Sequence, residues 1–519
     1  MTDLLDSGRR SRPSSSVPAS GPAAFLRRER APLFVGLLGL AISLIGIWVP
    51  SVWYDEAATI TAATRSWPEL WAMIGNVDAV HAVYYFVIHA LVDIFGYSPV
   101  LVRLPSAIAV GVAASLTVVL ARKFTSTRVA ALAGIVFCLL PRVTWMGTEA
   151  RSYALSAALA VLMTLLFVRA QRSDGWRPWV AYAIVVVLSS LVFVYLALIV
   201  VAHGVSVAWW IIARRTRPHP YRRWPVARRF LVASISAAIL LVPFLLAVVG
   251  QSGQLHWIHP IGPDTWRQVV QTQWFYYSFE YATAGWALLL FGGAALLRRT
   301  RGFSFGAVLL PLVVVPTLVL LLASVLDTPL YTPRYLTMCL PFVALVMAMG
   351  IAAIPTRALR ILTVLSLVVL AVPQATFQRM PEGKQDSSWK EVAAFIADER
   401  ASAPGLTTAI IYGPVKHHPI ATTRVIEYSY PEAFAGTIDV TLDTPAAQTA
   451  QLWETEHPLS ESVDRLERAD VAYLITSTSR DQRDATTTQM VRAGWTLTES
   501  VGFTDVNVLQ YRPAGAAGR

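Results

Sequence analysis

Charged residues are scarce in this sequence. Of its 519 residues only 14% are Asp, Glu, Lys or Arg and 55% are hydrophobic, whereas soluble domains carry about 25% charged residues. The mean hydropathy is +0.52, and most apolar residues stand in uninterrupted blocks instead of at helical or strand spacing. A chain of this kind cannot cover itself with polar surface in water. The composition therefore excludes a soluble fold for most of the chain and predicts an integral membrane protein.

The sequence also has few cysteines and no Gly-rich phosphate-binding motif at the start of its polar C-terminal region. The two cysteines, Cys138 and Cys339, both lie inside apolar blocks, where we expect them to serve as packing residues. This pattern indicates neither a disulfide framework nor a zinc site. No Gly-rich phosphate loop opens the polar C-terminal region, which disfavours nucleotide binding there. A cleavable signal peptide is not expected either, because the first apolar block begins only near Leu33.

The charges are unevenly distributed along the chain. Residues 1–376 contain 30 basic and 13 acidic residues, whereas residues 377–519 contain 13 basic and 19 acidic ones. In the first part the arginines stand in short runs between apolar blocks, which is the pattern of cytoplasmic loops under the positive-inside rule. These loops explain the pI near 9.8, so we do not expect nucleic acid as a partner.

Apolar blocks that could form membrane-spanning helices recur along the first part of the chain, and each span needs about 20 mainly apolar residues. Eleven blocks qualify: residues 33–50, 100–120, 129–146, 152–168, 179–194, 196–213, 230–249, 282–297, 305–325, 336–355 and 361–376. We therefore predict an all-α polytopic domain over residues 33–376 in the plasma membrane. The preceding residues 1–32, rich in Arg, Ser and Pro, are expected to form a disordered cytoplasmic tail.

A further apolar segment, residues 81–96, contains His81, His89 and Asp93. If it crossed the membrane, every arginine cluster downstream would lie outside the cell, against the positive-inside rule. We therefore expect a juxtamembrane or re-entrant helix, which is allowed where protein covers its backbone. With the eleven crossings predicted above, the N-terminus lies inside and the C-terminus outside.

Residues 377–519 are of a different kind. Helical patterns such as the one that starts at Trp389 alternate with strand-like runs at residues 407–412, 471–476 and 506–511. This alternation predicts a small α/β domain. The predicted topology places this domain on the extracytoplasmic side of the membrane.

Two adjacent carboxylates, Asp55 and Glu56, follow the first predicted span directly. Ionisable residues at the membrane boundary are functional candidates because burying them is costly; the solvated start of a loop is the alternative. Adjacent residues point in different directions, so one could touch a substrate while the other orients a neighbour. This arrangement favours a single general base over a pair of glycosidase carboxylates.

Basic residues are rare on the predicted outer side of the membrane domain. Six lie there: Arg65, Arg103, Arg142, Arg151, Arg267 and Arg334. Because membrane insertion disfavours arginine on that side, a shared anion such as a phosphate would explain them, since guanidinium groups bind phosphate oxygens in a bidentate manner. For Arg151 a simple pair with Glu149 explains the residue equally well.

Five short motifs in a fixed order resemble a known family. They are Asp55-Glu56, His81-Ala-Val-Tyr84-Tyr85 with His89, Val-Arg103-Leu-Pro-Ser, Glu149-Ala-Arg151-Ser-Tyr153 and Pro333-Arg334-Tyr335-Leu. Together they are similar to those of the membrane-embedded C-type glycosyltransferases, in the branch of the protein O-mannosyltransferases and the bacterial lipid A aminoarabinose transferases. The resemblance covers roughly residues 33–380. One departure is that bacterial members often have His-Pro-Pro-Leu-Tyr where this chain has His81-Ala-Val-Tyr.

The resemblance implies an inverting glycosyltransferase on the outer face of the membrane that takes its sugar from polyprenyl phosphate. Asp55 would be the general base, and Glu56 would position the acceptor or the loop. The donor phosphate site would consist of Arg103, Arg151 and Arg334. The substrate site would consist of His81, Tyr84, Tyr85, Glu149 and Tyr335. An aromatic belt at the membrane interface is the alternative for the tyrosines. No cofactor is required because the arginines can stabilise the leaving phosphate, although some relatives use a divalent metal.

The high content of Ala, Val and Arg is similar to that of high-GC actinobacterial proteins. For such a source the resemblance implies decaprenyl-phosphate mannose or arabinose as the donor. The acceptor would be a cell-envelope glycan, a glycolipid or a protein.

Two other classes of protein are alternatives. A transporter or lipid flippase would show inverted repeats and helices broken by Gly or Pro with ionisable groups near mid-membrane. Such repeats are not evident, and the charged residues instead cluster at the outer boundary. A non-catalytic envelope scaffold would leave Asp55 dispensable.

Overall fold

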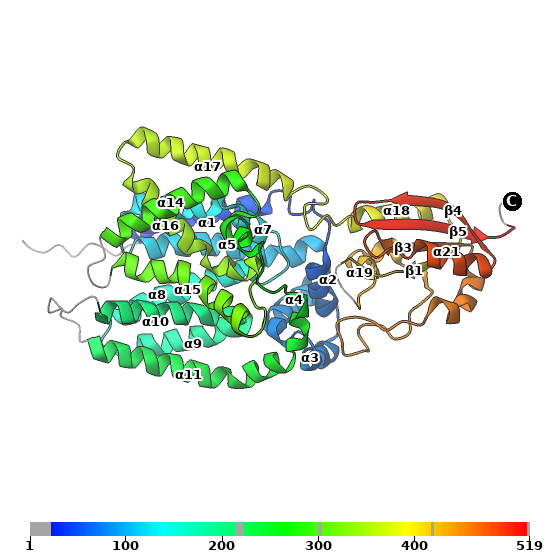
Figure 1. Cartoon of the computed structure of the whole chain (residues 1–519), viewed down its shortest axis with the longest axis horizontal. Coiled ribbons are helices and arrows are strands. Elements are labelled where there is room, and N and C mark those ends of the chain that lie inside the picture. The colour runs from blue at the N-terminus through cyan, green and yellow to red at the C-terminus, as the bar shows by residue number, and fades with distance from the viewer. Residues whose placement is uncertain (1–21, 213–222, 299–303, 417–419, 516–519) are drawn as a thin grey trace, which may run out of the picture.

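The computed structural model describes residues 22–212, 223–298, 304–416 and 420–515, without the side chains of residues 22–29, 223 and 254–256. Figure 1 shows a bundle of long helices, a smaller domain with a β-sheet near the C-terminus, and short helices between these two parts.

Each apolar block predicted to span the membrane coincides with a helix of the bundle. These helices are α1 (Pro22–Leu44), α5 (Pro99–Ala121), α6 (Thr127–Leu139) with α7 (Pro141–Met146), α8 (Tyr153–Gln171), α9 (Arg177–Val192), α10 (Ala197–Ile212), α11 (Arg223–Gly250), α14 (Phe279–Arg298), α15 (Phe305–Leu326), α16 (Leu340–Ala353) and α17 (Arg357–Phe377). Within the described ranges, 8 helical segments are long and apolar enough to cross a membrane. The chain is therefore a multi-pass membrane protein. The apolar parts of α1, α6 and α9 are shorter, so a total of eleven crossings remains a prediction.

Two of the blocks are interrupted where the apolar runs predict unbroken spans. The helix α1 ends at Leu44, and the chain turns at Gly46, whose φ of +70° is in the left-handed region that favours glycine. The block 129–146 divides into α6 and α7 because Pro141 disfavours the helical conformation at the residue before it. That residue, Leu140, accordingly has φ −65° and ψ 126°.

The short helices form a layer at one end of the bundle. They are α2 (Tyr54–Ala63), α3 (Trp67–Asn76) and α4 (Ala82–Phe95), and Figure 1 shows them beside the C-terminal domain. Arg103, near the start of α5, donates hydrogen bonds of 2.9 Å to the carbonyls of Ile47 and Pro50, just after α1. The chain thus enters and leaves this layer at the same end of the bundle, so α4 does not run along the bundle's length.

Basic residues at the end of α8 and near the start of α11 lie close together at the opposite end of the bundle. The guanidinium group of Arg172 lies 5.2 Å from the ring centre of Phe124, and that ring stacks on Phe305. Arg229 donates to the carbonyl of Ser173 at 3.5 Å. Since α5 starts at the short-helix layer and ends at Ala121, these contacts lie at the end remote from the C-terminal domain. The orientation of this end in the membrane remains a prediction.

The C-terminal domain contains a five-stranded sheet with the strand order β2-β1-β3-β5-β4. The strands are β1 (Thr408–Tyr412), β2 (Ile438–Asp439), β3 (Val471–Ser477), β4 (Trp495–Gly502) and β5 (Val506–Pro513). The strand β1 pairs in parallel with β2 and β3, whereas β5 pairs antiparallel with β3 and β4. The three predicted strand runs correspond to β1, β3 and β5. The sequence did not indicate β2, which has two residues, or β4, whose side chains are mostly exposed.

One apolar cluster connects the short-helix layer to the C-terminal domain. It contains Val52 and Ala57 beside the bundle, Trp389 from α18 (Trp389–Ser402), and Ile410 and Tyr473 from the sheet. Burial of this shared surface holds the C-terminal domain against α2. The start of α2 carries the carboxylates that the sequence singles out.

Candidate active site

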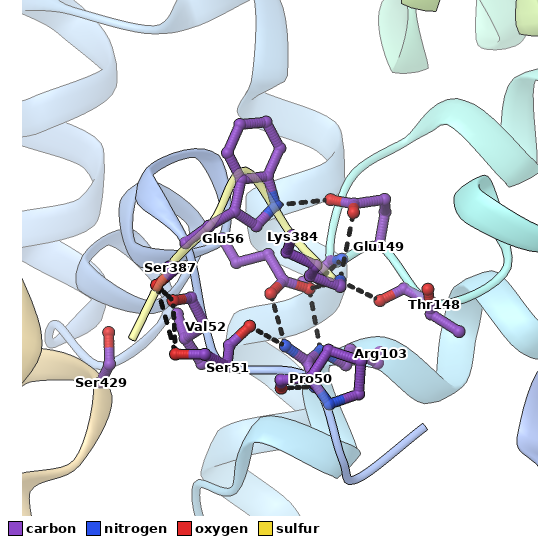
Figure 2. A network of polar contacts seen from close by, with 12 residues as sticks. Pro50, Ser51, Val52, Glu56, Arg103, Thr148, Glu149, Lys384, Ser387 and Ser429 are labelled. Carbon is purple, nitrogen blue, oxygen red and sulfur yellow. Dashed lines mark hydrogen bonds and ion pairs between the residues drawn. The ribbon is translucent and has the colours of Figure 1, made fainter. Parts of the chain in front are cut away.

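A network of four buried charges lies at the start of α2 (Figure 2). Glu56 accepts from Arg103 Nε at 2.9 Å and Nη2 at 2.6 Å, and from Lys384 Nζ at 2.7 Å. Lys384 also pairs with Glu149 at 3.1 Å, and Glu149 accepts from the indole N–H of Trp53 at 2.8 Å. The two carboxylates and two cations have side chains only 0–1% exposed. The network is neutral when all four groups are charged.

Arg103 is fully occupied by protein acceptors. Besides its fork onto Glu56 and its bonds to Ile47 and Pro50, it donates from Nη2 to the carbonyl of Ser51 at 3.0 Å. These contacts use all five N–H donors of the guanidinium group. Arg103 therefore has no N–H group left to offer the donor phosphate in this structure, and its predicted role as a phosphate ligand is not proposed further. Its role is to hold Glu56 and the turn after α1.

Glu56 and Glu149 have no exposed surface and so do not touch a substrate in this structure. Burial would raise the pKa of Glu56, but Arg103 and Lys384 outweigh it and lower that pKa to about 2. Burial raises the pKa of Glu149 to about 7. Glu56 also accepts from the backbone N–H of Ala150 at 3.0 Å. The contacts of both residues tie α2 to the segment before α8, which favours a positioning role for Glu56 and for Glu149, for which the sequence had predicted substrate binding.

Asp55, the neighbour of Glu56, forms an ion pair with Arg334. The distance from Asp55 Oδ2 to Arg334 Nη1 is 2.8 Å, and the two side chains remain 13% and 19% exposed, respectively. The Arg334 guanidinium group lies 4.5 Å from the ring centre of Trp257 and 5.8 Å from that of Trp53. Its Nε is buried and has no hydrogen-bond partner among the described residues. The ion pair therefore keeps an N–H group that can donate to a ligand, and it remains accessible to solvent.

Arg151 reaches the same region through Tyr85. It donates to the hydroxyl of Tyr85 at 3.0 Å, and this hydroxyl in turn donates to Asp78 Oδ2 at 2.7 Å. Arg151 is 6% exposed, and its Nε also lacks a partner among the described groups. Glu149 pairs with Lys384 instead, so the interpretation of Arg151 as the simple partner of Glu149 is wrong.

A small pocket opens beside these residues, and Asp78 is part of its lining. Its lining includes His81 from the layer of short helices, Tyr335 from the 3₁₀ turn Pro333–Cys339, and Gln251 after α11. Tyr335 stacks on Tyr195, another lining residue, at 4.6 Å between ring centres. Burial, together with the positive charges of Arg151 and Arg334, lowers the pKa of His81 to about 3, against the opposing effect of Asp55. His81 is therefore a neutral hydrogen-bonding group at physiological pH.

The structure divides the predicted residues into two groups. Asp55, His81, Tyr85, Arg151, Arg334 and Tyr335 lie at or beside the pocket. Glu56, Arg103 and Glu149 lie behind it in the buried network, and Tyr84 is only 2% exposed. Tyr85, which contacts Arg151, is 0% exposed, so neither tyrosine offers a surface to a substrate in this structure.

A third outer arginine approaches the site from α7. Arg142 is 3% exposed, donates from Nη2 to the carbonyl of Thr272 at 2.6 Å, and lies 4.7 Å from the ring centre of Tyr276. Its Nε lacks a partner among the described residues, as in Arg151 and Arg334. Arg334 is close enough for its charge to act on Arg142. Three arginines with unused N–H groups thus face a region where Asp55 and Asp78 supply the negative charge.

Sequence reasoning missed Lys384 and Asp78. Lys384 was overlooked because the count of outer basic residues ended at residue 376, just before the segment that returns to the membrane domain. Asp78 is an isolated acidic residue three positions before His81, and this spacing could have revealed it. Among the described residues, no group of three or more His, Cys, Asp or Glu side chains could hold a metal ion.

Comparison with known proteins defines the fold. No family model and no curated protein matches the sequence. Among solved structures, the chain has the fold of the membrane-embedded C-type glycosyltransferases, as its motifs predict. It is similar to ArnT from Cupriavidus metallidurans in the apo state, with a TM-score of 0.61 and 12% identity over 96% of this chain and 100% of that chain.

Two further solved structures are similar to the chain. ArnT from Cupriavidus metallidurans bound to undecaprenyl phosphate has a TM-score of 0.58 at 12% identity, again over 96% of this chain and 100% of that chain. The Archaeoglobus fulgidus oligosaccharyltransferase has a TM-score of 0.47 at 11% identity over 88% of this chain and 70% of that chain. The latter value is too low to support a structural argument.

Proposed function

We propose that this protein is an inverting glycosyltransferase that moves a sugar from polyprenyl phosphate to a hydroxyl group of an envelope glycan, glycolipid or protein. The observation that carries the proposal is the Asp55–Arg334 ion pair of 2.8 Å, which lies beside Arg151 and the pocket lined by His81 and Tyr335. A carboxylate next to unsatisfied arginines combines a proton acceptor with a phosphate site. We further propose that this site faces the outer side of the membrane, where the predicted topology places it.

The donor side of the site consists of arginines with free N–H groups. Arg151 and Arg334 each have a buried Nε without a partner among the described residues, which is costly unless a ligand completes it. A phosphate has the charge and the acceptor oxygens to satisfy both guanidinium groups. ArnT, whose fold this chain shares, was solved bound to undecaprenyl phosphate, which supports a polyprenyl phosphate as the ligand here. Arg142 is a third candidate for the same anion.

The chemical step needs a base and a stabilised leaving group. Asp55 takes the proton of the acceptor hydroxyl while that oxygen attacks the anomeric carbon from the face opposite the phosphate. The bond between the anomeric carbon and the phosphate oxygen breaks, and the polyprenyl phosphate leaves with one additional negative charge. Arg151 and Arg334 stabilise that charge as it develops. Neutral His81 and Tyr335 are placed to hydrogen-bond or stack against the sugar in the pocket.

The test uses purified full-length protein in lipid vesicles with polyprenyl-phosphate mannose or polyprenyl-phosphate arabinose as donor. We expect consumption of one of these donors, with release of polyprenyl phosphate, when an envelope extract supplies the acceptor. A protein that binds neither donor nor undecaprenyl phosphate would contradict the proposal. A protein that moves the intact donor across the bilayer without cleaving it would instead be a flippase. Donor cleavage that does not need Asp55 would contradict its role as the base, and a protein that binds the donor but neither cleaves nor transports it would be a scaffold.

A further inference from the structure

Lys384 belongs to the segment between α17 and α18, yet its ammonium group lies inside the network of the membrane domain. Its Nζ contacts Glu56 at 2.7 Å and Glu149 at 3.1 Å, and it donates to the carbonyl of Thr148. The side chain is 1% exposed. Burying a lysine to this depth carries a large desolvation cost, which the two carboxylates must offset.

The backbone around Lys384 is bent so that the side chain enters the network. A Cβ atom on Gly383 would lie 2.5 Å from the carbonyl oxygen of Phe377, so only glycine fits there. Gln385 and Asp386 follow with φ of 57° and 60°. Non-glycine residues rarely adopt this left-handed conformation, and such strain persists only where the surroundings impose it. Two consecutive strained residues and a required glycine therefore position one lysine.

The two carboxylates that Lys384 bridges belong to the two segments that carry the proposed site. Glu56 is adjacent to Asp55 on α2, and Glu149 is two residues before Arg151. Without Lys384 these carboxylates would face each other beside Arg103, whose five N–H groups are already used. They would repel each other, and this repulsion would strain the contacts between segment 148–151 and α2, among them the hydrogen bond of 3.0 Å from Ala150 N–H to Glu56.

Residues of the C-terminal part of the chain also form hydrogen bonds with the residues just before Asp55. Ser387 Oγ donates to the carbonyl of Val52 at 2.6 Å, and the N–H of Val52 donates to Tyr430 at 2.9 Å. The indole N–H of Trp453 donates to the hydroxyl of Tyr54 at 2.9 Å. Lys384 is thus the charged member of a larger set of contacts that seat the C-terminal domain on α2.

We propose that Lys384 is a positioning residue that keeps Asp55 and Arg151 at the separation that the reaction needs. Its positive charge offsets the repulsion between Glu149 and Glu56, so activity depends on a C-terminal domain that is docked on α2. The inference rests on the proposed function, because it concerns the geometry of that site. Lys384 itself touches no substrate. Its effect is carried by its charge, and any change that removes the repulsion between the two carboxylates will restore much of the geometry.

The test compares three full-length variants in lipid vesicles. Lys384→Met removes the charge at similar volume, and Lys384→Met with Glu149→Gln removes the charge and the repulsion together. Lys390→Met is the matched control, since Lys390 lies in the same region with an exposed side chain, whose Nζ donates to the carbonyl of Trp48 at 3.1 Å and contacts neither Glu56 nor Glu149. We measure turnover of the sugar donor, affinity for undecaprenyl phosphate, and thermal unfolding at pH 6 and pH 8.

We expect Lys384→Met to lower kcat roughly 10²-fold at pH 8, the scale of a misplacement of about 1 Å at a catalytic group. Affinity for undecaprenyl phosphate should fall less, because Arg334 is held independently. The double variant should recover most of the loss. At pH 6 the single variant should recover in part, because Glu149, which faces Glu56 and Arg103, can then take up a proton. Lys390→Met should match the wild type.

A folded Lys384→Met variant with wild-type turnover at both pH values would overturn the inference. So would a double variant no more active than the single one. If Lys384→Met does not fold, the double variant alone decides, since turnover within a few-fold of wild type supports the inference and a loss of roughly 10²-fold overturns it. Wild-type protein that neither binds undecaprenyl phosphate nor cleaves the donor would contradict the proposed function instead.

Discussion

The buried network and the cluster beside the pocket contain the same kinds of residue but differ in how their charges are balanced. In the network Glu56 and Glu149 face Arg103 and Lys384, and every N–H group of Arg103 donates to a protein oxygen. Beside the pocket, Arg142, Arg151 and Arg334 each keep an N–H without a partner among the described residues. The first group (Glu56, Arg103, Glu149 and Lys384), here the closed network, is fully paired within the protein and stabilises the structure. The second group (Asp55, Arg142, Arg151 and Arg334), here the open cluster, has unused N–H groups that can bind an anion. The difference between binding residue and structural residue thus lies in unused donors, not in residue type.

This contrast predicts that Asp55→Asn damages chemistry more than anything else in the site. The amide keeps the shape of the side chain but cannot accept the acceptor's proton, so turnover should fall by roughly 10²–10⁴-fold. Affinity for undecaprenyl phosphate and the unfolding temperature should change little. The measurement is donor turnover by purified protein in vesicles. Glu280→Gln, on the first turn of α14 and outside the site, serves as the control.

Arg103→Met should lower the stability of the protein and leave donor binding nearly unchanged. It leaves Glu56 buried at 0% exposure with Lys384 as its remaining cation, and breaking a buried pair from one side costs about 3–5 kcal/mol. The variant should unfold at a clearly lower temperature or accumulate poorly. Donor affinity measured on whatever folds should be close to normal. A stable Arg103→Met protein that fails to bind undecaprenyl phosphate would restore Arg103 to the phosphate site.

Substitutions of Arg151 and Arg334 should act on donor binding. Replacement by Ala removes charged hydrogen bonds and should weaken the binding of undecaprenyl phosphate by about 1.5–3 kcal/mol each. Replacement by Lys keeps the charge but loses the planar fork, so the loss should be smaller but measurable. Stability should be nearly unchanged, unlike in Arg103→Met. If both Ala variants bind as the wild type does, the open cluster is not the phosphate site.

The smallest expected effect is a pH dependence of stability through Glu149. Burial raises its pKa to about 7, above the unfolded value of about 4.3, so its contribution is full below pH 4.3 and is lost as the pH rises through 7. The wild type should therefore lose a few degrees of unfolding temperature relative to Glu149→Gln between pH 5 and pH 8. Identical pH profiles for the two proteins would show that Glu149 does not titrate in this range.

The sequence predicted the parts of this molecule that follow from local pattern. Apolar blocks located the helices of the bundle, and alternation located β1, β3 and β5. The order of five motifs identified the fold, and Asp55, Arg151 and Arg334 were selected by their place in that order. Boundaries were missed at Gly46 and Pro141, where single residues turn the chain inside an apolar run.

The division between the closed network and the open cluster could not be predicted from the sequence. It depends on contacts between segments that are far apart in the chain, such as Lys384 with Glu56 and Glu149. Spacing within a motif does not reveal that Arg103 has no free donor or that Glu149 turns away from Arg151. These facts follow only from counting the hydrogen bonds of each group in three dimensions.

The most direct test of the central claim is a structure of the protein with undecaprenyl phosphate. The open cluster predicts phosphate oxygens at ~3 Å from guanidinium nitrogens of both Arg151 and Arg334, with Asp55 adjacent to the pocket and every bond of Arg103 unchanged. A phosphate bound elsewhere, with the 2.8 Å pair between Asp55 and Arg334 intact and both Nε atoms still without partners, would contradict it.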